Sequence, residues 1–408
     1  EVHNGLFIDY GPHSLLFYQK FKIKTMERGN SMKNISYAII GAGNGGLAMA
    51  GYLSLMGYDV SLYNRTLENI LDLIKKPEIK LTGEVEGSGK LKLVTNNIGE
   101  AIKGRDIIMV TIPAMGHYKL AKDMAPYLED DQIIVLNPGR TGGALEVYGT
   151  IKKDYPNKNI VVAEAQTFIY ACRATSRSSA HIFKSKKEVS LAAIPSNKTL
   201  NIINLLKPAY PQFMPAKDVI ETSINNYGAI FHPAPTLLNS GHIERGAPFE
   251  YYKEGITPSI GSFIEKMDAE RMALGKLLNV NTLSAKDWLY ETYGAIGENL
   301  YEAVQNNPAY CGLQAPKGLN IRYIYEDVPC SLVPISSLAK EYHIETPAID
   351  SIIRIAEFMT GVDFYAKGRN IERLGLEGLK TKEIHEFAET GVIRKNIKSV
   401  DGKEVVAS

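Results

Sequence analysis

The sequence predicts an α/β fold, with a doubly wound parallel sheet domain followed by a mostly α-helical domain. Short apolar, β-branched runs alternate with helical patterns in the first half of the chain. A cluster of glycines separates the first such run from the helical pattern that follows it. Beyond about residue 210 the strand signals almost vanish and long amphipathic helical patterns replace them. We therefore expect a sheet domain over 32–206 and a helical domain over 207–394.

The elements of the first domain follow in order along the chain. Strands are predicted at 35–40, 59–64, 90–95, 106–113, 132–138, 159–165 and 188–195. Helical patterns cover 46–57, 69–76, 118–128 and 143–155, and in the second domain 259–279, 285–293, 336–343 and 348–361. Alternation of strand and helix is typical of a parallel sheet with helical crossovers.

The two ends of the chain differ in character from the rest. The stretch that opens "SMKNISYAII" reads as a natural start at Met32, and residues 1–31 lack the basic-then-apolar order of a signal peptide. We expect 1–31 to be an extension, disordered or added during cloning, and the polar tail 395–408 to be loose.

Composition excludes several classes of protein. Lys plus Arg is 46 and Asp plus Glu is 45 in 408 residues, so there is no electrostatic case for nucleic acid or an anionic membrane. The three cysteines show no zinc spacing, and no other metal-ligand cluster is visible. We expect buried thiols in a reducing cytoplasm, no disulfide framework and no metal site.

The glycine cluster decides between a membrane span and a ligand-binding turn. The uncharged stretch 34–58 is long enough to cross a bilayer, but its glycines would break a spanning helix. Instead, G-x-G-x-x-G follows a strand and opens a helix, which is the Rossmann fingerprint for a dinucleotide pyrophosphate. A tight turn without a ligand is the alternative. The predicted cofactor contacts here are Gly41, Gly43, Asn44, Gly45 and Gly46.

The end of the second strand indicates which cofactor binds. An NAD site usually carries an acidic residue there for the ribose 2′-OH, whereas this chain has Asn64 and Arg65. No carboxylate would repel a 2′-phosphate, and Arg65 can pair with one. NADP(H) is therefore favoured over NAD(H), unless Arg65 is only a solvated surface charge.

Three loops should meet at the carboxyl edge of the sheet, at 111–117, 137–143 and 164–173. Pro113 is expected to face the nicotinamide. His117 fits either a catalytic base or a residue at a helix start. Arg140 and Arg173 fit either a substrate carboxylate or a structural ion pair.

The helical domain contains a second polar group. His232 lies between apolar residues and before Pro233, where a histidine is usually a satisfied core residue. Arg322 and Asp327 lie five residues apart, which fits an ion pair or a helix cap. Together, a histidine, an aspartate and an arginine also fit proton transfer and carboxylate binding.

These motifs resemble the octopine/nopaline-type opine dehydrogenases over roughly Met32 to Arg394. The resemblance is carried by "GAGNGG", "NPGRTGGALE", "HPAPTLLN", "DAERMALGK" and "RYIYEDVP". It implies an enzyme that joins an amino acid to a 2-oxo acid, with pyruvate the first choice, and reduces the imine with NAD(P)H. It also implies that His232 is catalytic, that Asp327 is its partner and, less directly, that Arg322 binds a substrate carboxylate.

Other interpretations stay open. Another two-domain dehydrogenase could reduce a ketopantoate-like acid or a sugar phosphate, although such enzymes commonly rely on a lysine. A non-catalytic NADP(H) sensor would bind cofactor without turnover. We expect a cytoplasmic protein whose partners are small molecules, with no nucleic acid or membrane, and we allow for a homodimer.

Overall fold

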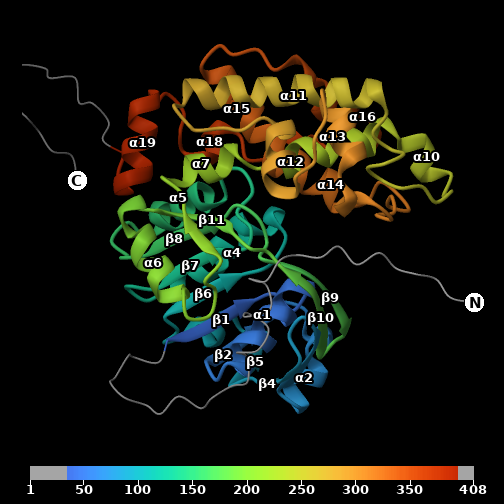
Figure 1. The fold of residues 1–408 in the computed structure, drawn as a ribbon. Coiled ribbons are helices and arrows are strands. Elements are labelled where there is room, and N and C mark those ends of the chain that lie inside the picture. Colours follow the sequence, from blue (N-terminus) through green and yellow to red (C-terminus); the bar gives the residue numbers. More distant parts are fainter. Residues whose placement is uncertain (1–34, 394–408) are drawn as a thin grey trace, which may run out of the picture. The chain divides into compact units, whose positions relative to one another are not determined.

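The computed structural model describes residues 35–393, so the predicted extension 1–31 and tail 395–408 lie outside the described residues (Figure 1). The larger sheet has eight strands in the order β12-β11-β8-β7-β6-β1-β2-β5. They are β1 (Ser36–Ile40), β2 (Asp59–Tyr63), β5 (Leu93–Thr95), β6 (Ile107–Val110), β7 (Ile133–Leu136), β8 (Val161–Ala165), β11 (Val189–Ile194) and β12 (Phe213–Pro215).

The predicted parallel sheet is confirmed from β8 through to β5. At the other edge, β11 runs antiparallel to β8, and β12 pairs parallel with β11. The chain leaves β8 at its carboxyl end, forms a hairpin and re-enters at the same edge, where Gln166 N–H donates to the Ser190 carbonyl. Without a helical crossover, the returning strand must run antiparallel.

A second, four-stranded sheet was not predicted. Its order is β4-β3-β10-β9, and its strands are β3 (Glu78–Gly83), β4 (Gly87–Lys90), β9 (Tyr170–Ser176) and β10 (Ser179–Ser185). Of the single strand expected at 90–95, residue 90 ends β4 of the smaller sheet and residues 93–95 form β5 of the larger sheet. The end of the loop expected at 164–173 is part of β9. The pairing of β10 with β3 joins segments about a hundred residues apart, which no local pattern reveals.

Helices cover both faces of the larger sheet (Figure 1). Alternate residues of each strand point to opposite faces, so Ile39 packs in the core with α1 whereas Ile40 packs in the core with α4 and α5. The helices of the sheet domain are α1 (Asn44–Leu55), α2 (Leu71–Lys75), α3 (Ile98–Ile102), α4 (His117–Met124), α5 (Gly143–Asp154) and α6 (Thr199–Leu206), with short 3₁₀ turns η1 (Leu67–Asn69), η2 (Ala114–Gly116), η3 (Ala125–Tyr127) and η4 (Ser196–Lys198).

The second half is helical, as predicted. Its elements are α7 (Val219–Ile224), α8 (Gly228–Phe231), α9 (Pro233–Leu238), α10 (Ser240–Glu244), α11 (Pro258–Leu277), α12 (Ala285–Tyr293), α13 (Leu300–Asn306), η5 (Pro308–Tyr310), α14 (Arg322–Tyr325), the π-helix η6 (Val328–Leu332), α15 (Val333–Glu341), α16 (Pro347–Thr360), α17 (Phe364–Lys367), α18 (Ile371–Leu374) and α19 (Thr381–Thr390). Two residues mark the start of α11. The Thr257 side chain caps the first turn, and Pro258 is the first residue of the helix.

The two halves share one apolar core. The cluster that contains Ile40 and Ile108 of the sheet continues into α11 and α16 of the helical domain. β12 lies beyond the expected boundary at residue 206 and still pairs with β11, and α19 packs beside β11 and α7. Within residues 35–393 no helix is long and apolar enough to cross a membrane.

Candidate active site

The glycine turn has the geometry that a dinucleotide cradle needs. Gly41 has a φ angle of +114°, which residues with a side chain rarely adopt. A Cβ at Gly46 would lie 1.7 Å from the Gly41 carbonyl oxygen. A Cβ at Gly43 would meet no atom within 4 Å, so this glycine faces open space. The turn therefore fits the three glycine roles: a tight turn, close approach of a pyrophosphate, and close helix packing.

The neighbours of these glycines are engaged with the protein. The Asn44 side chain accepts a hydrogen bond from Ala174 N–H at 2.9 Å. A Cβ at Gly45 would lie 2.5 Å from the Phe168 ring. These contacts attach the start of α1 to β9 and the segment before it. They give Asn44 and Gly45 a packing role beside the turn.

At the end of β2, Asn64 is hydrogen-bonded to the protein, whereas Arg65 is exposed to solvent. Asn64 Oδ1 accepts from Ala42 N–H at 3.2 Å, and its Nδ2 donates to the Thr66 carbonyl at 2.8 Å. Asn64 thus connects the strand end to the glycine turn. Arg65 is exposed, as is Pro113 beyond the end of β6.

His232 is held at the junction of α8 and α9, where Pro233 starts the second helix. Its carbonyl accepts hydrogen bonds from Thr236 Oγ1 at 2.8 Å and from the Tyr251 hydroxyl at 2.7 Å. Its imidazole stacks on the Tyr323 ring with centroids 4.2 Å apart. The backbone and the ring plane are therefore both fixed.

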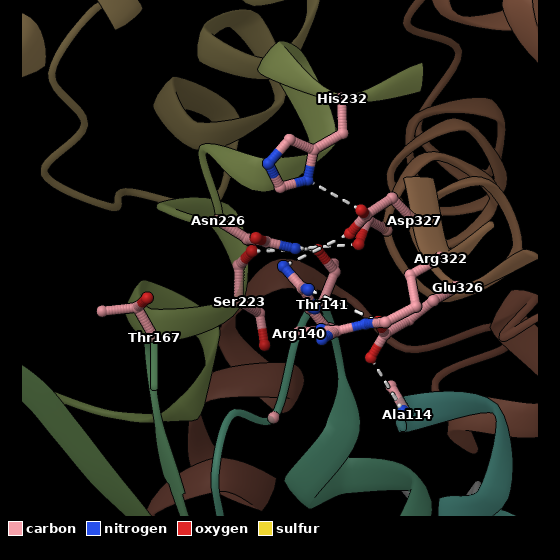
Figure 2. Close-up of polar contacts among 12 residues, drawn as sticks. Ala114, Arg140, Thr141, Thr167, Ser223, Asn226, His232, Arg322, Glu326 and Asp327 are labelled. Atoms are coloured by element: carbon pink, nitrogen blue, oxygen red, sulfur yellow. Dashed lines mark hydrogen bonds and ion pairs between the residues drawn. The ribbon is translucent and has the colours of Figure 1, made fainter. Parts of the chain in front are cut away.

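Asp327 and His232 meet although 95 positions separate them. His232 Nδ1 lies 2.8 Å from Asp327 Oδ2 (Figure 2). The Asp327 side chain is fully buried and the His232 side chain keeps 20% of its exposure. With Nδ1 directed at the carboxylate, Nε2 is the ring nitrogen left for another group.

Arg140 contacts the other side of Asp327. Its Nη1 lies 3.3 Å from Asp327 Oδ1 and its Nη2 lies 3.5 Å from Glu326 Oε2 (Figure 2). A Cβ at Gly228 would lie 2.6 Å from Arg140 Nη1, so a glycine leaves room for the guanidinium. Arg140 has a positive φ of 63°. Of the two roles expected for Arg140, the structure contains the ion pair.

Glu326 joins both halves of the protein, and sequence analysis missed it. Oε1 accepts from Ala114 N–H of the sheet domain at 2.9 Å, and Oε2 accepts from Arg322 Nε at 2.6 Å (Figure 2). Burial alone would raise the pKa of Glu326, but the charges of Arg140 and Arg322 outweigh burial and lower it to about 2. The i, i+4 spacing of Arg322 and Glu326 was the available signal.

A cavity of about 650 Å³ lies beside this group. Its lining is Arg140, His232, Gln314, Pro316, Asn320, Ile321, Arg322 and Tyr323. The Arg322 side chain is 62% exposed, and only its Nε is bound to Glu326. The cavity thus presents one imidazole and two guanidinium groups, which suits an anionic substrate that must exchange a proton.

His117 and Arg173 are not part of this cavity. His117 is fully buried at the start of α4, where Arg369 Nη2 lies 3.0 Å from its Nδ1. Burial, and then the charge of Arg369, lower the pKa of His117 to about 3. His117 therefore fits the helix-start role rather than a catalytic base. Arg173 is exposed on β9 of the smaller sheet.

Arg369 is a buried structural residue that no sequence pattern indicated. It donates to the carbonyls of Gly139 at 2.8 Å, Thr141 at 3.1 Å and Ala114 at 3.2 Å, and it pairs with Glu146. It thereby fixes both sheet-domain loops that reach the site, the loop of Arg140 and the loop of Ala114.

The cysteine expectation was only partly right. Cys330 is buried, and burial raises its pKa to about 12, but Cys172 is half-buried and Cys311 is exposed. All three are free thiols. Among residues 35–393, no group of three or more His, Cys, Asp or Glu side chains could hold a metal ion.

Comparison with known proteins shows the family of the chain. The family described as "NAD/NADP octopine/nopaline dehydrogenase, alpha-helical domain" matches residues 215–360, and "Ketopantoate reductase PanE/ApbA" matches residues 37–188. The opine dehydrogenase of Arthrobacter sp. (strain 1C) is 38% identical over 87% of this chain and 99% of its own length. The octopine dehydrogenase of Pecten maximus is 24% identical over 70% of this chain and 77% of its own length.

A solved octopine dehydrogenase in complex with NADH and agmatine shares the fold. It has a TM-score of 0.74 at 21% identity and covers 89% of this chain and 100% of its own. A solved yersinopine dehydrogenase with NADP⁺ bound has a TM-score of 0.71 at 14% identity and covers 86% of this chain and 100% of its own. The chain belongs to the opine dehydrogenase family and is an NAD(P)-dependent oxidoreductase that acts on CH–NH donors.

Proposed function

We propose that this chain condenses the amino group of an amino acid with a 2-oxo acid, reduces the resulting imine, and catalyses the reverse oxidation. The observation that supports it best is the buried Asp327 carboxylate 2.8 Å from Nδ1 of a histidine that lines the cavity. The substrates would enter beside Arg322. Pyruvate is the first oxo acid to test.

His232 is the proton donor and acceptor in this proposal. The amine nitrogen attacks the oxo-acid carbonyl carbon and gives a carbinolamine, whose hydroxyl must leave as water. A proton on His232 Nε2 passes to that hydroxyl as the C–O bond breaks and the C=N bond forms. Asp327 accepts from Nδ1–H, fixes the tautomer and stabilises the imidazolium, and Arg140 holds Asp327 in place.

Arg322 is the carboxylate-binding residue. Glu326 accepts from its Nε and leaves both of its Nη groups free to donate bidentately to a carboxylate. A carboxylate bound in this way would hold the imine carbon in a fixed position for hydride transfer. Such positioning is the main contribution that a protein makes to a reaction whose hydride comes from the cofactor.

The residues at the glycine turn would hold the nicotinamide cofactor. Gly41, Gly43 and Gly46 would bind the pyrophosphate, with Asn44, Gly45 and Asn64 shaping the turn around them. Pro113 would lie at the nicotinamide. When bound, the cofactor supplies the hydride that reduces the imine.

We infer a preference for NADP(H) over NAD(H) from the end of β2. Arg65 is exposed there, with no carboxylate at positions 64–66. Arg177, from the turn between β9 and β10, donates to the Glu68 carbonyl, so a second guanidinium lies beside the same segment. Arg65→Ala should reduce the preference roughly ten- to hundredfold, as expected for one lost charge-assisted bond. A wild-type preference for NADH would refute the inference.

The experiment for the main proposal is a matrix of amino acids and 2-oxo acids, each assayed with NADPH and NADH, with the product mass measured. The cofactor should be oxidised only when both substrates are present, and the product should equal the condensed, reduced pair in mass. Reduction of an oxo acid without any amine would favour the ketopantoate-like alternative. Cofactor binding without turnover would favour a sensor.

A further inference from the structure

The cavity beside His232 is lined by two chemically different sets of residues. The charged set is Arg140, His232 and Arg322, and the proposed reaction uses each of these side chains. Apart from Tyr323, which stacks on His232, the other lining residues are uncharged and come from one short stretch of chain. We call them the uncharged lining: Gln314, Pro316, Asn320 and Ile321.

The uncharged lining is fixed relative to His232. The backbone on both sides of Gln314 is hydrogen-bonded to the segment 249–251, and one of these bonds joins the Tyr251 N–H to the Leu313 carbonyl at 2.7 Å. The Tyr251 hydroxyl in turn donates to the His232 carbonyl at 2.7 Å. A single residue, Tyr251, therefore connects the start of the uncharged lining to the histidine.

The polar side chains of the uncharged lining can contact a ligand. Gln314 and Asn320 are both exposed. Gln314 Nε2 donates only to the Gly312 carbonyl, at a long distance of 3.5 Å, and within residues 35–393 the Asn320 side chain makes no hydrogen bond. A carboxamide both donates and accepts hydrogen bonds and carries no charge. These two side chains therefore suit an uncharged group.

The uncharged lining continues directly into the residue proposed to bind a carboxylate. Asn320 and Ile321 precede Arg322, the first residue of α14, and all three line the same cavity. The side chain of an amino acid branches from the carbon atom next to its carboxylate. An amino acid whose carboxylate binds Arg322 would therefore have its side chain within reach of the uncharged lining.

The charges around the cavity disfavour a cationic side chain. None of the eight lining residues is acidic. The carboxylates of Glu326 and Asp327 are buried and are paired with Arg140 and Arg322. His232 would add a further positive charge whenever it is protonated. The side chain of an arginine or lysine substrate would thus meet like charges and no free carboxylate of the lining, which disfavours binding.

We propose that the uncharged lining binds the side chain of the amino-acid substrate, and that the protein prefers amino acids with uncharged side chains to arginine and lysine. Gln314 and Asn320 would form hydrogen bonds with such a side chain, and Pro316 and Ile321 would contact its apolar part. This inference rests on the proposed function, and it names the class of amino acid that the cavity accepts.

The test compares kcat/KM for glutamine, leucine, arginine and lysine, each with the 2-oxo acid that the wild type accepts. The wild type should prefer glutamine or leucine. Gln314→Glu should raise kcat/KM for arginine relative to leucine on the order of tenfold, because it supplies the missing carboxylate. Asn320→Asp should change the ratio in the same direction. Lys317→Gln is the matched control: it changes the net charge by the same amount on the same stretch, but Lys317 does not line the cavity.

A second control is Glu250→Gln. Glu250 pairs with Gln314 across an isolated β-bridge but does not line the cavity, so this substitution should leave the preference unchanged. A wild type that prefers arginine or lysine would overturn the inference. So would an unchanged ratio in both Gln314→Glu and Asn320→Asp, an equal change in Lys317→Gln, or a change confined to selectivity among 2-oxo acids. Absence of turnover by the wild type with every pair of substrates would overturn the proposed function itself and the inference with it.

Discussion

Replacing Glu326 by glutamine tests the connection between the two halves of the site. All three groups around this carboxylate are donors: Ala114 N–H, Arg322 Nε and Arg140 Nη2. Glutamine has the same shape, but its amide has one acceptor oxygen, and its NH₂ group must face a donor. The substitution also leaves Asp327 as the remaining anionic partner of the buried Arg140.

The pKa of Glu326 gives the size of the effect. A decrease from the ordinary 4.5 to about 2 means that the charged form stabilises the fold by about 3 kcal/mol at neutral pH, at 1.36 kcal/mol per pH unit. The side chain is 4% exposed, so solvent screening removes little of this. Because the folded-state pKa is depressed, this stabilisation is present above pH 4.5 and is lost as the pH falls towards 2.

The assay is urea unfolding of wild type and Glu326→Gln at two pH values. At pH 7 the free energy of unfolding of the variant should be about 3 kcal/mol lower than that of wild type. At pH 4 this difference should be smaller by about 1 kcal/mol. The KM of the substrate bound by Arg322 should rise on the order of tenfold, because Arg322 loses its anchor. Glu345→Gln, at an exposed position, is the control and should change stability by less than about 0.5 kcal/mol. Equal stability of Glu326→Gln and wild type at pH 7 would refute the reasoning.

Two further predictions follow from particular contacts. His385 Nδ1 lies 2.8 Å from Asp218 Oδ2, and its Nε2 lies 2.6 Å from the Leu278 carbonyl oxygen. Only the imidazolium can donate to both acceptors, and the hydrogen bond to Asp218 is the main cause that raises the pKa of His385. This stabilisation should be complete below about pH 6.5 and lost as the pH rises through the folded-state pKa. The melting temperatures of wild type and His385→Gln should therefore converge at alkaline pH, and a constant difference between them up to about pH 9 would contradict this. Gly46→Ala should abolish cofactor binding or folding, because its Cβ would lie 1.7 Å from the Gly41 carbonyl oxygen. Calorimetry measures binding and circular dichroism measures folding, and Gly149→Ala is the control because a Cβ there meets no atom within 4 Å. Cofactor binding by Gly46→Ala equal to that of wild type would contradict the prediction.

Features set by neighbouring residues could be predicted from the sequence. The glycine turn needs only a strand, three glycines and a helix, and the conformation of Gly41 agrees with the fingerprint. The long helix α11 was found to within a residue or two, since Thr257 and Pro258 mark its start. Both signals lie within one turn of the structure that they specify.

Features set by distant residues could not be predicted in this way. The pairing of β10 with β3 and the contacts of Arg369 depend on where the chain returns in space, and neither leaves a local pattern. The contact between His232 and Asp327 was expected only through resemblance to a family, because spacing alone does not connect residues so far apart. Glu326 could be predicted as an i, i+4 partner of Arg322, but its contact with Ala114 of the sheet domain leaves no local pattern.

In the proposed mechanism His232 and Asp327 act as one catalytic unit. Steady-state turnover of His232→Gln, Asp327→Asn and the double variant tests this proposal most directly. Samples should first be matched for folding by melting temperature and for NADPH binding by calorimetry. Each single variant should lower kcat by ~10²–10⁴, the usual loss when general acid–base catalysis is removed. The double variant should be little worse than either single variant, because residues that act as a unit are not additive. Near-wild-type kcat for folded, cofactor-binding His232→Gln would contradict the claim.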